Sequence, residues 1–453
     1  MKNTIVALAT PTGRSGVGVI RLSGADSLQI VRKLTNDNNF NPKPRFANLR
    51  KIYDHETREV LDETIITFFK SPNSFTGEDI IEISCHGSPI VLRQIIDFCL
   101  KLDARMAEAG EFSLRALANG QMNLSQAEAI RDLIDAQTVA SARQSVRQLR
   151  GELSNELQPL KDELLDVIVV LESSLEFVED DLPDFQSEKI KLKLQALAEN
   201  IGKFASTFQA GKLLREGIKV ALVGRPNVGK SSLFNALLGQ DRAIVTEIAG
   251  TTRDQIHEKL VIKNIPVSLI DTAGLRETTD TVESIGVERS RRAMVDADLV
   301  VVLLDGSQDL TDDDKEILEN TEDFSRIIAF NKIDLLIDHQ AKSQITNRKS
   351  QIVEISAKTG EGLTELQKAI IEPFHPQEIE QSGFLISDAR HNDLLLRAKT
   401  EIETSLNLLD QKLSEEIVLI GLHNSIRFLG QITGETTTED MLTRIFSTFC
   451  IGK

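Results

Sequence analysis

The hydrophobic positions at the start of the chain follow a short alternating pattern. Residues 1 to about 118 contain apolar runs such as IVALAT and GVGVIRLSG, which are separated by clusters of glycine, proline and serine. Short alternating runs bounded by such clusters are typical of strands joined by turns. The pattern therefore predicts a compact α+β domain over residues 1–118.

Near residue 125 the pattern changes to long, charged segments that contain little glycine. Up to about residue 214 apolar residues recur every three or four positions, as in SQAEAIRDLIDAQTVASARQ, and this spacing predicts amphipathic helices. An alternation of strands and loops begins at GIKVALVG and continues to about Phe374, after which helical spacing returns. We therefore expect a helical domain in two pieces, 119–214 and 376–453, with a nucleotide-binding domain at 215–375 inserted between them.

Length and composition are those of a multidomain globular protein. The chain has 453 residues, of which 41% are hydrophobic and 27% charged, so a fibrous or disordered chain is excluded. The net charge of −17 disfavours binding to nucleic acid through bulk charge, so any RNA contact must be local. Three widely spaced cysteines make neither a disulfide framework nor a zinc site, and no apolar run has membrane-spanning length. We expect a reduced, cytoplasmic protein that has no membrane partner.

A phosphate-binding loop (P-loop) is predicted where the sequence reads GRPNVGKSS, at residues 224–232. An apolar strand precedes it and a helix follows it, so backbone N–H groups and the positive end of the helix converge on phosphate. Lys230 would reach the β- and γ-phosphates, and the Ser231 hydroxyl would bind Mg²⁺.

Three further motifs follow, each directly after an apolar strand. Asp271–Gly274 (DTAG) would meet Mg²⁺ through a water and the γ-phosphate through an N–H. Asn331–Asp334 (NKID) places a carboxylate where guanine offers two donors, its N1–H and its 2-amino group. Ser356–Lys358 (SAK) could support the base with a main-chain N–H. The four motifs in this order predict a GTP-binding, GTP-hydrolysing domain.

The residue after DTAG carries no polar group. GTPases of the Ras type have a glutamine there that orients the attacking water, but this chain has Leu275, so another residue must do so. The candidates for orienting the water are polar residues of the following segment, Arg276, Glu277 and Glu283. Each of them could instead be an exposed residue of a solvated loop. Upstream, Thr251 or Thr252 of the segment TEIAGTTRD could complete the coordination of Mg²⁺.

Taken together, these residues make the sequence similar to the MnmE or TrmE family of tRNA-modification GTPases. The resemblance covers essentially the whole chain and rests on GRPNVGKSS, TEIAGTTRD, DTAGLRE, ATPTGRSGVGVIRLSG, SPNSFTGEDIIEISCHG, AGEFSLRALANGQ and CIGK. It implies a multidomain fold of α/β and α parts, in which an N-terminal folate-binding and dimerisation domain and a discontinuous helical domain flank an inserted Ras-like P-loop G domain. This order matches the one that the hydrophobic pattern predicts.

The resemblance also implies the residues that bind GTP and metals. The GTP-binding residues would be Asn227, Val228, Gly229, Lys230, Ser231, Ser232, Thr246, Glu247, Ile248, Ala249, Gly250, Thr251, Thr252, Asp271, Thr272, Ala273, Gly274, Asn331, Lys332, Asp334, Ser356, Ala357 and Lys358. Mg²⁺ would fall to Ser231 and Thr252. K⁺, in place of an arginine finger, would be bound by Asn227, Thr246, Ile248 and Thr251. The catalytic, water-orienting glutamate of the family falls on Glu283.

A reduced folate, 5,10-methylene- or 5-formyl-tetrahydrofolate, is the other implied cofactor, and its site would include Arg21, Glu82, Gln121 and Lys453. Gln121 departs from the lysine of the commoner NGKLDL pattern and brings no charge. Without the resemblance, Arg21 would be read as a solvated or interface residue and Glu82 as a surface residue.

Cys450 and His86 each allow two interpretations. Composition alone makes Cys450 a small buried hydrophobe, whereas the CIGK match places it near the folate and a candidate reaction centre. His86 stands beside Cys85, but no second Cys or His pair is in range, so we expect a packing or loop role for it rather than metal binding.

The implied function is a homodimeric GTPase, activated by K⁺-dependent dimerisation of its G domains, that works with a flavin-dependent partner of the MnmG or GidA type as a heterotetramer. Together they would add an aminomethyl or carboxymethylaminomethyl group to C5 of the wobble uridine of certain tRNAs. Arg143, Arg147 and Arg150 could contact the tRNA or form a solvated helix face. Two rivals are a ribosome-assembly switch, which the net charge of −17 opposes, and a folate-dependent one-carbon transferase that GTP only regulates.

Overall fold

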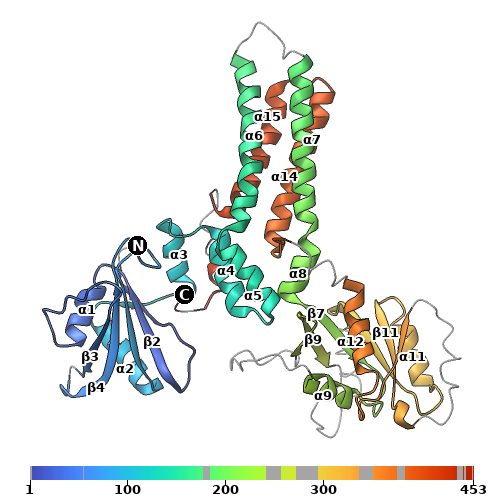
Figure 1. Ribbon diagram of the computed structural model, residues 1–453, viewed down its shortest axis with the longest axis horizontal. Helices are drawn as coiled ribbons and strands as arrows, with labels where there is room; N and C mark the ends of the chain where they lie inside the picture. Colours follow the sequence, from blue (N-terminus) through green and yellow to red (C-terminus); the bar gives the residue numbers. More distant parts are fainter. Residues whose placement is uncertain are drawn as a thin grey trace. The chain divides into compact units, whose positions relative to one another are not determined.

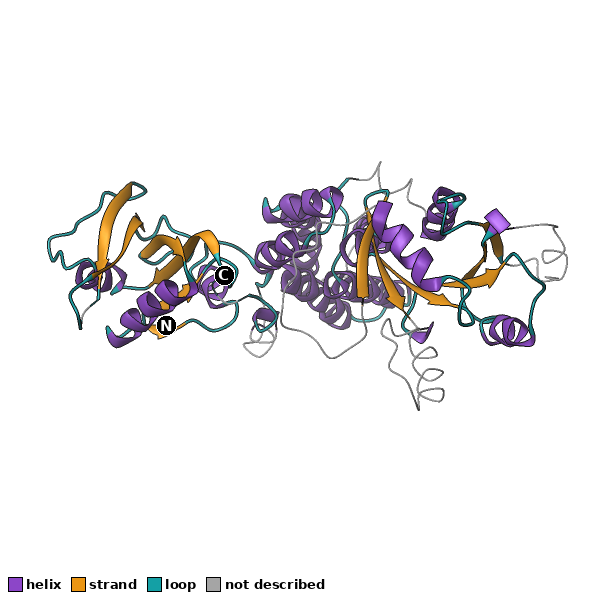
Figure 2. Cartoon of the chain, turned by 90° about the horizontal axis from the view of Figure 1, so that it is seen from below, coloured by secondary structure: helices purple, strands orange, loops and turns teal. Residues whose placement is uncertain are grey.

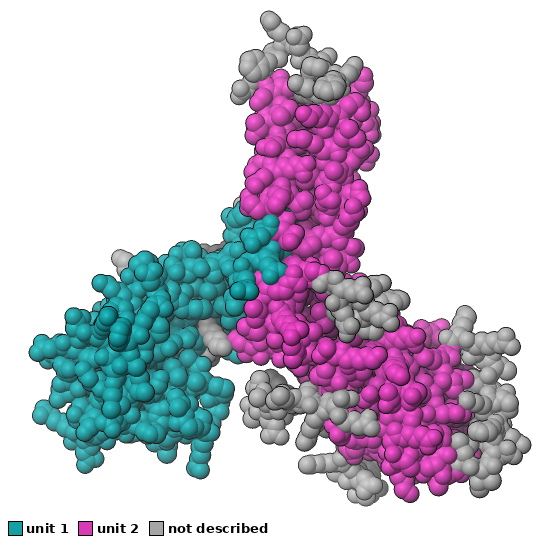
Figure 3. All heavy atoms as spheres, in the orientation of Figure 1, with its two compact units in different colours: residues 1–131, 148–155, 427–453 teal, residues 132–147, 156–426 magenta. Residues whose placement is uncertain are grey.

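The computed structural model describes residues 3–54, 56–176, 184–240, 257–271, 294–335, 350–374, 383–435, 442, 445–450 and 452. The chain forms two compact units, which Figure 3 colours separately. Unit 1 comprises residues 1–131, 148–155 and 427–453, and unit 2 comprises residues 132–147 and 156–426. These two units are defined by contacts and do not test the four segments expected from the sequence, which stay a prediction.

Unit 1 contains a mixed six-stranded sheet with the strand order β3-β4-β5-β2-β1-β6. Neighbouring strands are antiparallel except β1 and β6, which are parallel. The helices α1 (Ser27–Leu34) and α2 (Pro89–Lys101) contribute with the strands to one apolar core, so the α+β expectation is confirmed. The strands are β1 (Ile5–Leu8), β2 (Ser15–Ser23), β3 (Ala47–Tyr53), β4 (Val60–Phe69), β5 (Ile80–Gly87) and β6 (Arg105–Met106).

Residues from both ends of the sequence meet in unit 1. Helix α3 (Glu111–Ala118) follows the sheet, and helix α4 begins at Leu124. The rings of Phe446 and Phe449 pack against Leu124 and Ala127, which are both fully buried. The segment around residues 446–452 thereby becomes part of the N-terminal structure.

The helical part consists of two groups of helices that flank the G domain in the sequence. The long helices of both groups lie side by side in Figure 1. Lys191 of α7 pairs with Asp410 of α14 at 2.7 Å, and Gln144 of α5 donates to the carbonyl oxygen of Leu385 at 2.9 Å. The expected discontinuous helical domain is confirmed. Its helices are α4 (Leu124–Asp135), α5 (Val139–Leu149), α6 (Glu152–Glu176), α7 (Asp184–Ser206), α8 (Phe208–Glu216), α14 (Ala389–Asp410) and α15 (Glu415–Thr433).

The inserted G domain has a six-stranded sheet with the order β12-β11-β10-β7-β9-β8, parallel except for the edge strand β8. Separate apolar cores form on the two faces of the sheet, one with α9 and α12 and the other with α11. Figure 2 shows helices on both sides of this sheet. The elements are β7 (Ile218–Val223), α9 (Lys230–Gln240), β8 (His257–Ile262), β9 (Ile265–Asp271), β10 (Leu299–Asp305), α11 (Asp312–Asn320), β11 (Arg326–Asn331), η1 (Ile333–Leu335), β12 (Gln351–Glu354), α12 (Leu363–Ile371) and η3 (Glu372–Phe374).

The carboxyl ends of the parallel strands meet at one edge of this sheet, which is where open α/β sheets bind their ligands. The P-loop follows β7, the DTAG motif begins at the end of β9, NKID at the end of β11, and SAK directly after β12. We call this edge, with its P-loop and the NKID and SAK segments, the nucleotide edge. Across the residues that the structure describes, no helix combines the length and apolar character needed to cross a membrane.

Candidate functional site

The P-loop connects β7 to α9 in the conformation that a phosphate cradle needs. Asn227 and Gly229 both have left-handed backbone angles, with φ of 62° and 100°. A Cβ at Gly229 would lie 2.2 Å from the side-chain nitrogen of Asn331, so only glycine fits there. The Lys230 ammonium donates to the carbonyl oxygens of Gly224 at 2.5 Å and Arg225 at 2.9 Å, which places its charge inside the loop. A phosphate at the start of α9 would meet this charge and the N–H groups of the first helical turn.

The side chain of Asn331 joins three segments of the nucleotide edge. It is buried, its nitrogen donates to the carbonyl oxygen of Val228 in the P-loop at 2.8 Å, and its oxygen accepts from the N–H of Ala357 in the SAK segment at 2.9 Å. Phosphate binding and base recognition are therefore mechanically connected through one neutral amide.

Asp334 presents the carboxylate that suits guanine. It lies exposed in η1, and the buried hydroxyl of Ser356 donates to its Oδ1 at 2.7 Å. The same hydroxyl accepts from the N–H of Thr359 at 3.1 Å, which fixes its orientation. Lys358 is exposed beside it. The structure thus brings together the sequence-predicted residues of the P-loop, NKID and SAK.

Part of the expected nucleotide site lies outside the described residues. These positions are Thr246, Glu247, Ile248, Ala249, Gly250, Thr251, Thr252, Thr272, Ala273, Gly274, Leu275 and Glu283, together with the side chain of Asp271. Of the expected metal ligands, Ser231 and Asn227 are described, and both are exposed on the P-loop. A hydroxyl and a carboxamide oxygen are ligands that hard cations accept. Among the described residues no group of three or more His, Cys, Asp or Glu side chains could hold a metal.

Asp305, at the end of β10, is a nucleotide-edge residue that the sequence analysis missed. Its carboxylate accepts from Lys332 of NKID at 2.7 Å. It also lies 3.9 Å from the guanidinium of Arg225 in the P-loop. The signal was available, because Asp305 ends the buried run LVVVLLD just as Asn331 ends its own strand.

In unit 1, Arg21 and Glu82 face each other on neighbouring strands. They are paired in the register of β2 and β5, and the Arg21 guanidinium donates to Glu82 Oε1 through two nitrogens, at 2.9 and 2.7 Å. The guanidinium lies 5.7 Å from the ring centres of both Phe75 and Phe112. We call these four residues, with Gly452, the Arg21 cluster. Arg21 and Glu82 keep 20% and 27% of their side chains exposed, so a ligand could reach both.

The segment around residues 446–452 completes this cluster. The carbonyl oxygen of Gly452 accepts from Arg21 at 3.3 Å, and the carbonyl oxygen of Cys450 accepts from the N–H of Gly110 at 3.4 Å. Gly452 has a φ of 99°, and a Cβ there would lie 2.4 Å from the carbonyl oxygen of Leu8. Cys450 itself is exposed. The expectation of a buried Cys450 is therefore wrong, because its backbone makes the contact and its thiol does not.

The other residues of the expected folate site are placed less directly. Gln121 is exposed, and its Nε2 lies 3.1 Å from the position that a Cβ on Gly77 would take. It therefore stands against the 71–79 loop that carries Phe75, rather than in a described contact with Arg21. Lys453 lies outside the described residues.

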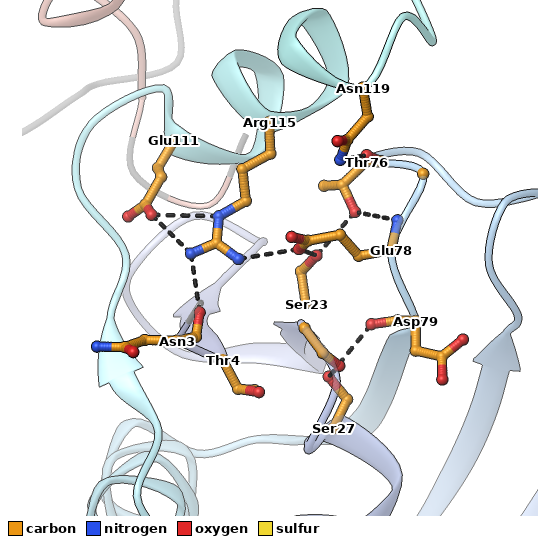
Figure 4. Close-up of polar contacts among 12 residues, drawn as sticks. Asn3, Thr4, Ser23, Ser27, Thr76, Glu78, Asp79, Glu111, Arg115 and Asn119 are labelled. Atoms are coloured by element: carbon orange, nitrogen blue, oxygen red, sulfur yellow. Dashed lines mark hydrogen bonds and ion pairs between the residues drawn. The ribbon is translucent and has the colours of Figure 1, made fainter. Parts of the chain in front are cut away.

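A buried guanidinium holds the 71–79 loop to α3. Arg115 is 2% exposed and donates to Glu111 and to Glu78, each at 2.9 Å, and to the carbonyl oxygen of Asn3 at 2.9 Å (Figure 4). Glu78 also accepts from the hydroxyl of Ser23 at 2.8 Å. We call these five residues the Arg115 network. The sequence analysis did not identify it, because its members come from four separate segments.

The remaining candidates have ordinary structural partners. His86 lies in β5 and not in a loop; its side chain is 76% exposed, and its Nδ1 lies 2.7 Å from Asp62 Oδ1. Burial raises the pKa of the thiols of Cys85 and Cys99 to about 12, and neither is a reactive thiolate. On α5, Arg143 is exposed, whereas Arg147 lies 5.9 Å from the Phe384 ring.

The chain is similar to known proteins along its whole length. It is 44% identical over 455 residues to the protein named tRNA modification GTPase MnmE from Aquifex aeolicus, and the match covers 100% of both chains. It is 42% identical over 459 residues to the protein of that name from Koribacter versatilis, again covering 100% of both. The chain belongs to the MnmE family of tRNA modification GTPases. The MnmE family is thus shown by similarity that extends well beyond the G domain.

Family models for separate parts agree with this assignment. The model of the GTP-binding protein TrmE N-terminus matches residues 4–121, and the model of the MnmE helical domain matches residues 124–450, a range that includes the inserted G domain. The chain is also 32% identical to the G domain of the T. maritima FeoB iron transporter, covering 34% of this chain and 97% of that one, with a TM-score of 0.26, which is too low to bear on the fold. Membership of the MnmE family identifies the protein as a GTPase and displaces the ribosome-assembly alternative.

Proposed function

We propose that this GTPase, together with a flavin-dependent partner, adds an aminomethyl or carboxymethylaminomethyl group to C5 of the wobble uridine of certain tRNAs. The observation that carries the proposal is the end-to-end similarity to relatives named tRNA modification GTPase, because it includes the N-terminal and helical parts as well as the G domain. A cytoplasmic, homodimeric protein that forms a heterotetramer with its partner is part of the proposal.

In the G domain, Lys230 and the N–H groups at the start of α9 bind and orient the phosphates of GTP, and Asp334 accepts hydrogen bonds from the base. Ser231 and Thr252 would hold Mg²⁺, and Asn227, Thr246, Ile248 and Thr251 would hold K⁺. Both ions would supply positive charge beside the phosphates. Glu283 orients the attacking water in place of the glutamine that Leu275 replaces.

In unit 1, a reduced folate binds beside the Arg21 cluster and supplies the one-carbon unit. The partly exposed Arg21 guanidinium and Glu82 carboxylate offer a cation and a hydrogen-bond acceptor, and Phe75 and Phe112 offer apolar faces. Gln121 and Lys453 are also part of the proposed folate site. The support for a folate site comes from the chemistry of the four described side chains, those of Arg21, Glu82, Phe75 and Phe112.

Nucleoside analysis of tRNA from a strain that lacks this protein tests the proposed reaction. We expect the C5 substituent of the wobble uridine to disappear and to return when the wild-type gene is supplied. Intact modification in the deletion strain would overturn the proposal. Failure of labelled tetrahydrofolate to bind the purified protein would remove the folate step alone.

The role of K⁺ is tested by comparing GTP turnover in KCl and NaCl at equal ionic strength. Because a bound cation would replace an arginine finger, we expect turnover to be at least about tenfold faster in KCl. Equal rates would remove K⁺ from the proposal. A Glu283→Ala variant should bind GTP normally and hydrolyse it slowly, and normal turnover in that variant would end the assignment of Glu283.

A further inference from the structure

Asp305 lies between the two halves of the nucleotide edge. Its strand, β10, lies between β7, which leads into the P-loop, and β11, which leads into NKID. In the pairing of β10 with β11, Asp305 lies opposite Asn331. Its side chain is 4% exposed. Oδ2 accepts from Lys332 and from Gln308, both at 2.7 Å, and Oδ1 accepts from the N–H and the hydroxyl of Ser307. A buried carboxylate therefore lies where phosphate binding and base recognition meet.

Arg225, the second residue of the P-loop, approaches the same carboxylate. Its Nη2 lies 3.9 Å from Asp305 Oδ2, and its Nε donates to Asp314 Oδ2 at 3.2 Å. Asp314 is 2% exposed and forms the capping box of α11 with Thr311, which fixes its position. Lys332, Asp305, Arg225 and Asp314 thus alternate in charge, and we call them the charge chain.

The central carboxylate is ionised. Its burial favours the neutral form, but hydrogen bonds from Lys332 and Ser307 outweigh burial and hold the pKa of Asp305 below its usual value. A neutral side chain at this position would leave the cations of Lys332 and Arg225 facing each other without the charge that separates them. The charge of Asp305, and not only its hydrogen bonds, therefore keeps both cations in place.

Lys332 needs such a restraint because its backbone conformation is unfavourable. Its φ is 68°, in the left-handed region that residues other than glycine rarely adopt. The residue stands between Asn331, which is tied to the P-loop, and Asp334, whose carboxylate faces solvent. A change at Lys332 would rotate the segment that presents Asp334.

We propose that Asp305 is a positioning residue for guanine recognition: through Lys332 it holds NKID in the conformation that presents Asp334 to the base, and through Arg225 it fixes NKID relative to the P-loop. Asp305 does not itself contact the nucleotide. It acts on the affinity for guanine nucleotides and on the discrimination between purine bases.

The test is a titration of the full-length protein with fluorescent GDP, with competition by unlabelled GDP and inosine diphosphate. The base of inosine diphosphate lacks the 2-amino group of guanine, which would donate a hydrogen bond to the carboxylate of Asp334. For Asp305→Asn we expect the affinity for GDP to fall about tenfold and that for inosine diphosphate to fall less, so that the ratio of the two affinities decreases. A general loss of structure would lower both affinities equally. An unchanged ratio, or wild-type affinity for GDP, would overturn the proposal.

Three further variants examine how Asp305 exerts its effect. If Asp305 acts through Lys332, the double variant Asp305→Asn/Lys332→Met should lose little more affinity for GDP than Lys332→Met alone, and additive losses would overturn this step. Arg225→Gln should weaken both diphosphates by about threefold without changing their ratio, because the P-loop binds phosphates, and wild-type affinity would remove the P-loop part of the proposal. The matched control is Asp312→Asn, since the side chain of Asp312 is 98% exposed and pairs with Lys315 on the same helix.

Discussion

The nucleotide edge and the Arg21 cluster both bring polar side chains together beside a six-stranded sheet, but they do so by different means. At the nucleotide edge, loops that follow neighbouring parallel strands are tied together by the neutral side chain of Asn331 and by the charge chain around Asp305. In the Arg21 cluster an ion pair crosses two antiparallel strands, and the carbonyl oxygen of Gly452 completes it. The nucleotide edge is thus formed by loops at one end of a sheet, whereas the Arg21 cluster depends on the docking of a segment that is distant in the sequence.

This difference matters for how each site responds to damage. Parallel strands deliver their carboxyl ends to the same edge whatever the side chains do, so a defect at the nucleotide edge should stay local. The Arg21 cluster lies among elements that the buried Arg115 network joins, so a defect there should spread through unit 1. The following changes test this contrast.

The largest effect is expected from Arg115→Met, which leaves Glu111 and Glu78 short of a partner inside unit 1. Breaking a buried charge pair typically costs about 3–5 kcal/mol. Hydrogen exchange of amides in β1 and α3 under increasing urea measures this loss, while the affinity for GDP should stay unchanged. The control is Arg93→Met on the exposed side of α2, expected to cost less than about 0.5 kcal/mol. Wild-type amide protection in Arg115→Met would show that the network does not hold the unit.

Asn331→Ala should have the next largest effect, and only at the nucleotide edge. It leaves the carbonyl oxygen of Val228 and the N–H of Ala357 without their partner, and two such losses correspond to about a hundredfold weaker binding of GDP. Titration with fluorescent GDP measures the affinity, and amide exchange in unit 1 should not change. Asn320→Ala, at an exposed position at the end of α11, is the control. An equal response of both units would break the contrast.

Gly452→Ala tests whether the Arg21 cluster depends on its docked segment. The φ of 99° and the approach to the carbonyl oxygen of Leu8 both oppose a side chain, so the segment should shift away from Arg21. We expect folate binding, measured by equilibrium dialysis with labelled tetrahydrofolate, to weaken about tenfold while GTP turnover is kept. Gly16→Ala is the control, because a Cβ there meets no atom within 4 Å. Unchanged folate affinity would mean that the cluster does not need the segment.

The smallest expected effect is on the stability of the protein at acidic pH. Burial opposes the ionisation of Glu111, but hydrogen bonds from Arg105, from the N–H of Glu108 and from Arg115 outweigh it and hold its pKa below the usual value. Since the pKa is lower in the folded state, this contribution to stability is complete above the unfolded pKa, about 4.3, and is lost as pH falls through the folded value. Wild-type protein should therefore lose more stability than Glu111→Gln between about pH 5 and 3. If the free energy of unfolding in urea changed equally with pH in wild-type protein and Glu111→Gln, the prediction would be contradicted.

The nucleotide edge could be predicted from the residues alone because each of its motifs is continuous and directly follows a strand. The connecting role of Asp305 was missed although it ends a buried strand, because its contacts with Arg225 and Lys332 follow only from the strand order. The hydrophobic pattern also predicted the two helical pieces and the inserted domain, because the periods of helices and strands differ.

The Arg21 cluster left no such trace in the sequence. Arg21 lies 61 positions from Glu82 and 431 from Gly452, and no local spacing connects them, so only the family resemblance indicated the site. Cys450 was misplaced by composition because a segment that docks through its backbone can leave its thiol in solvent. From the sequence, Arg115 would be interpreted as a surface residue of a short helix, because its partners Glu78 and Asn3 lie in other segments of the chain.

The docking of residues 446–452 against Gly110 and Arg21 also sets an order of events during translation. Chains are synthesised from the N-terminus, and domains fold largely as they emerge from the ribosome. The strands and loops of the nucleotide edge can assemble once residue 371 has emerged, whereas the Arg21 cluster must wait for Gly452. A nascent chain could therefore bind GTP before its Arg21 cluster is complete.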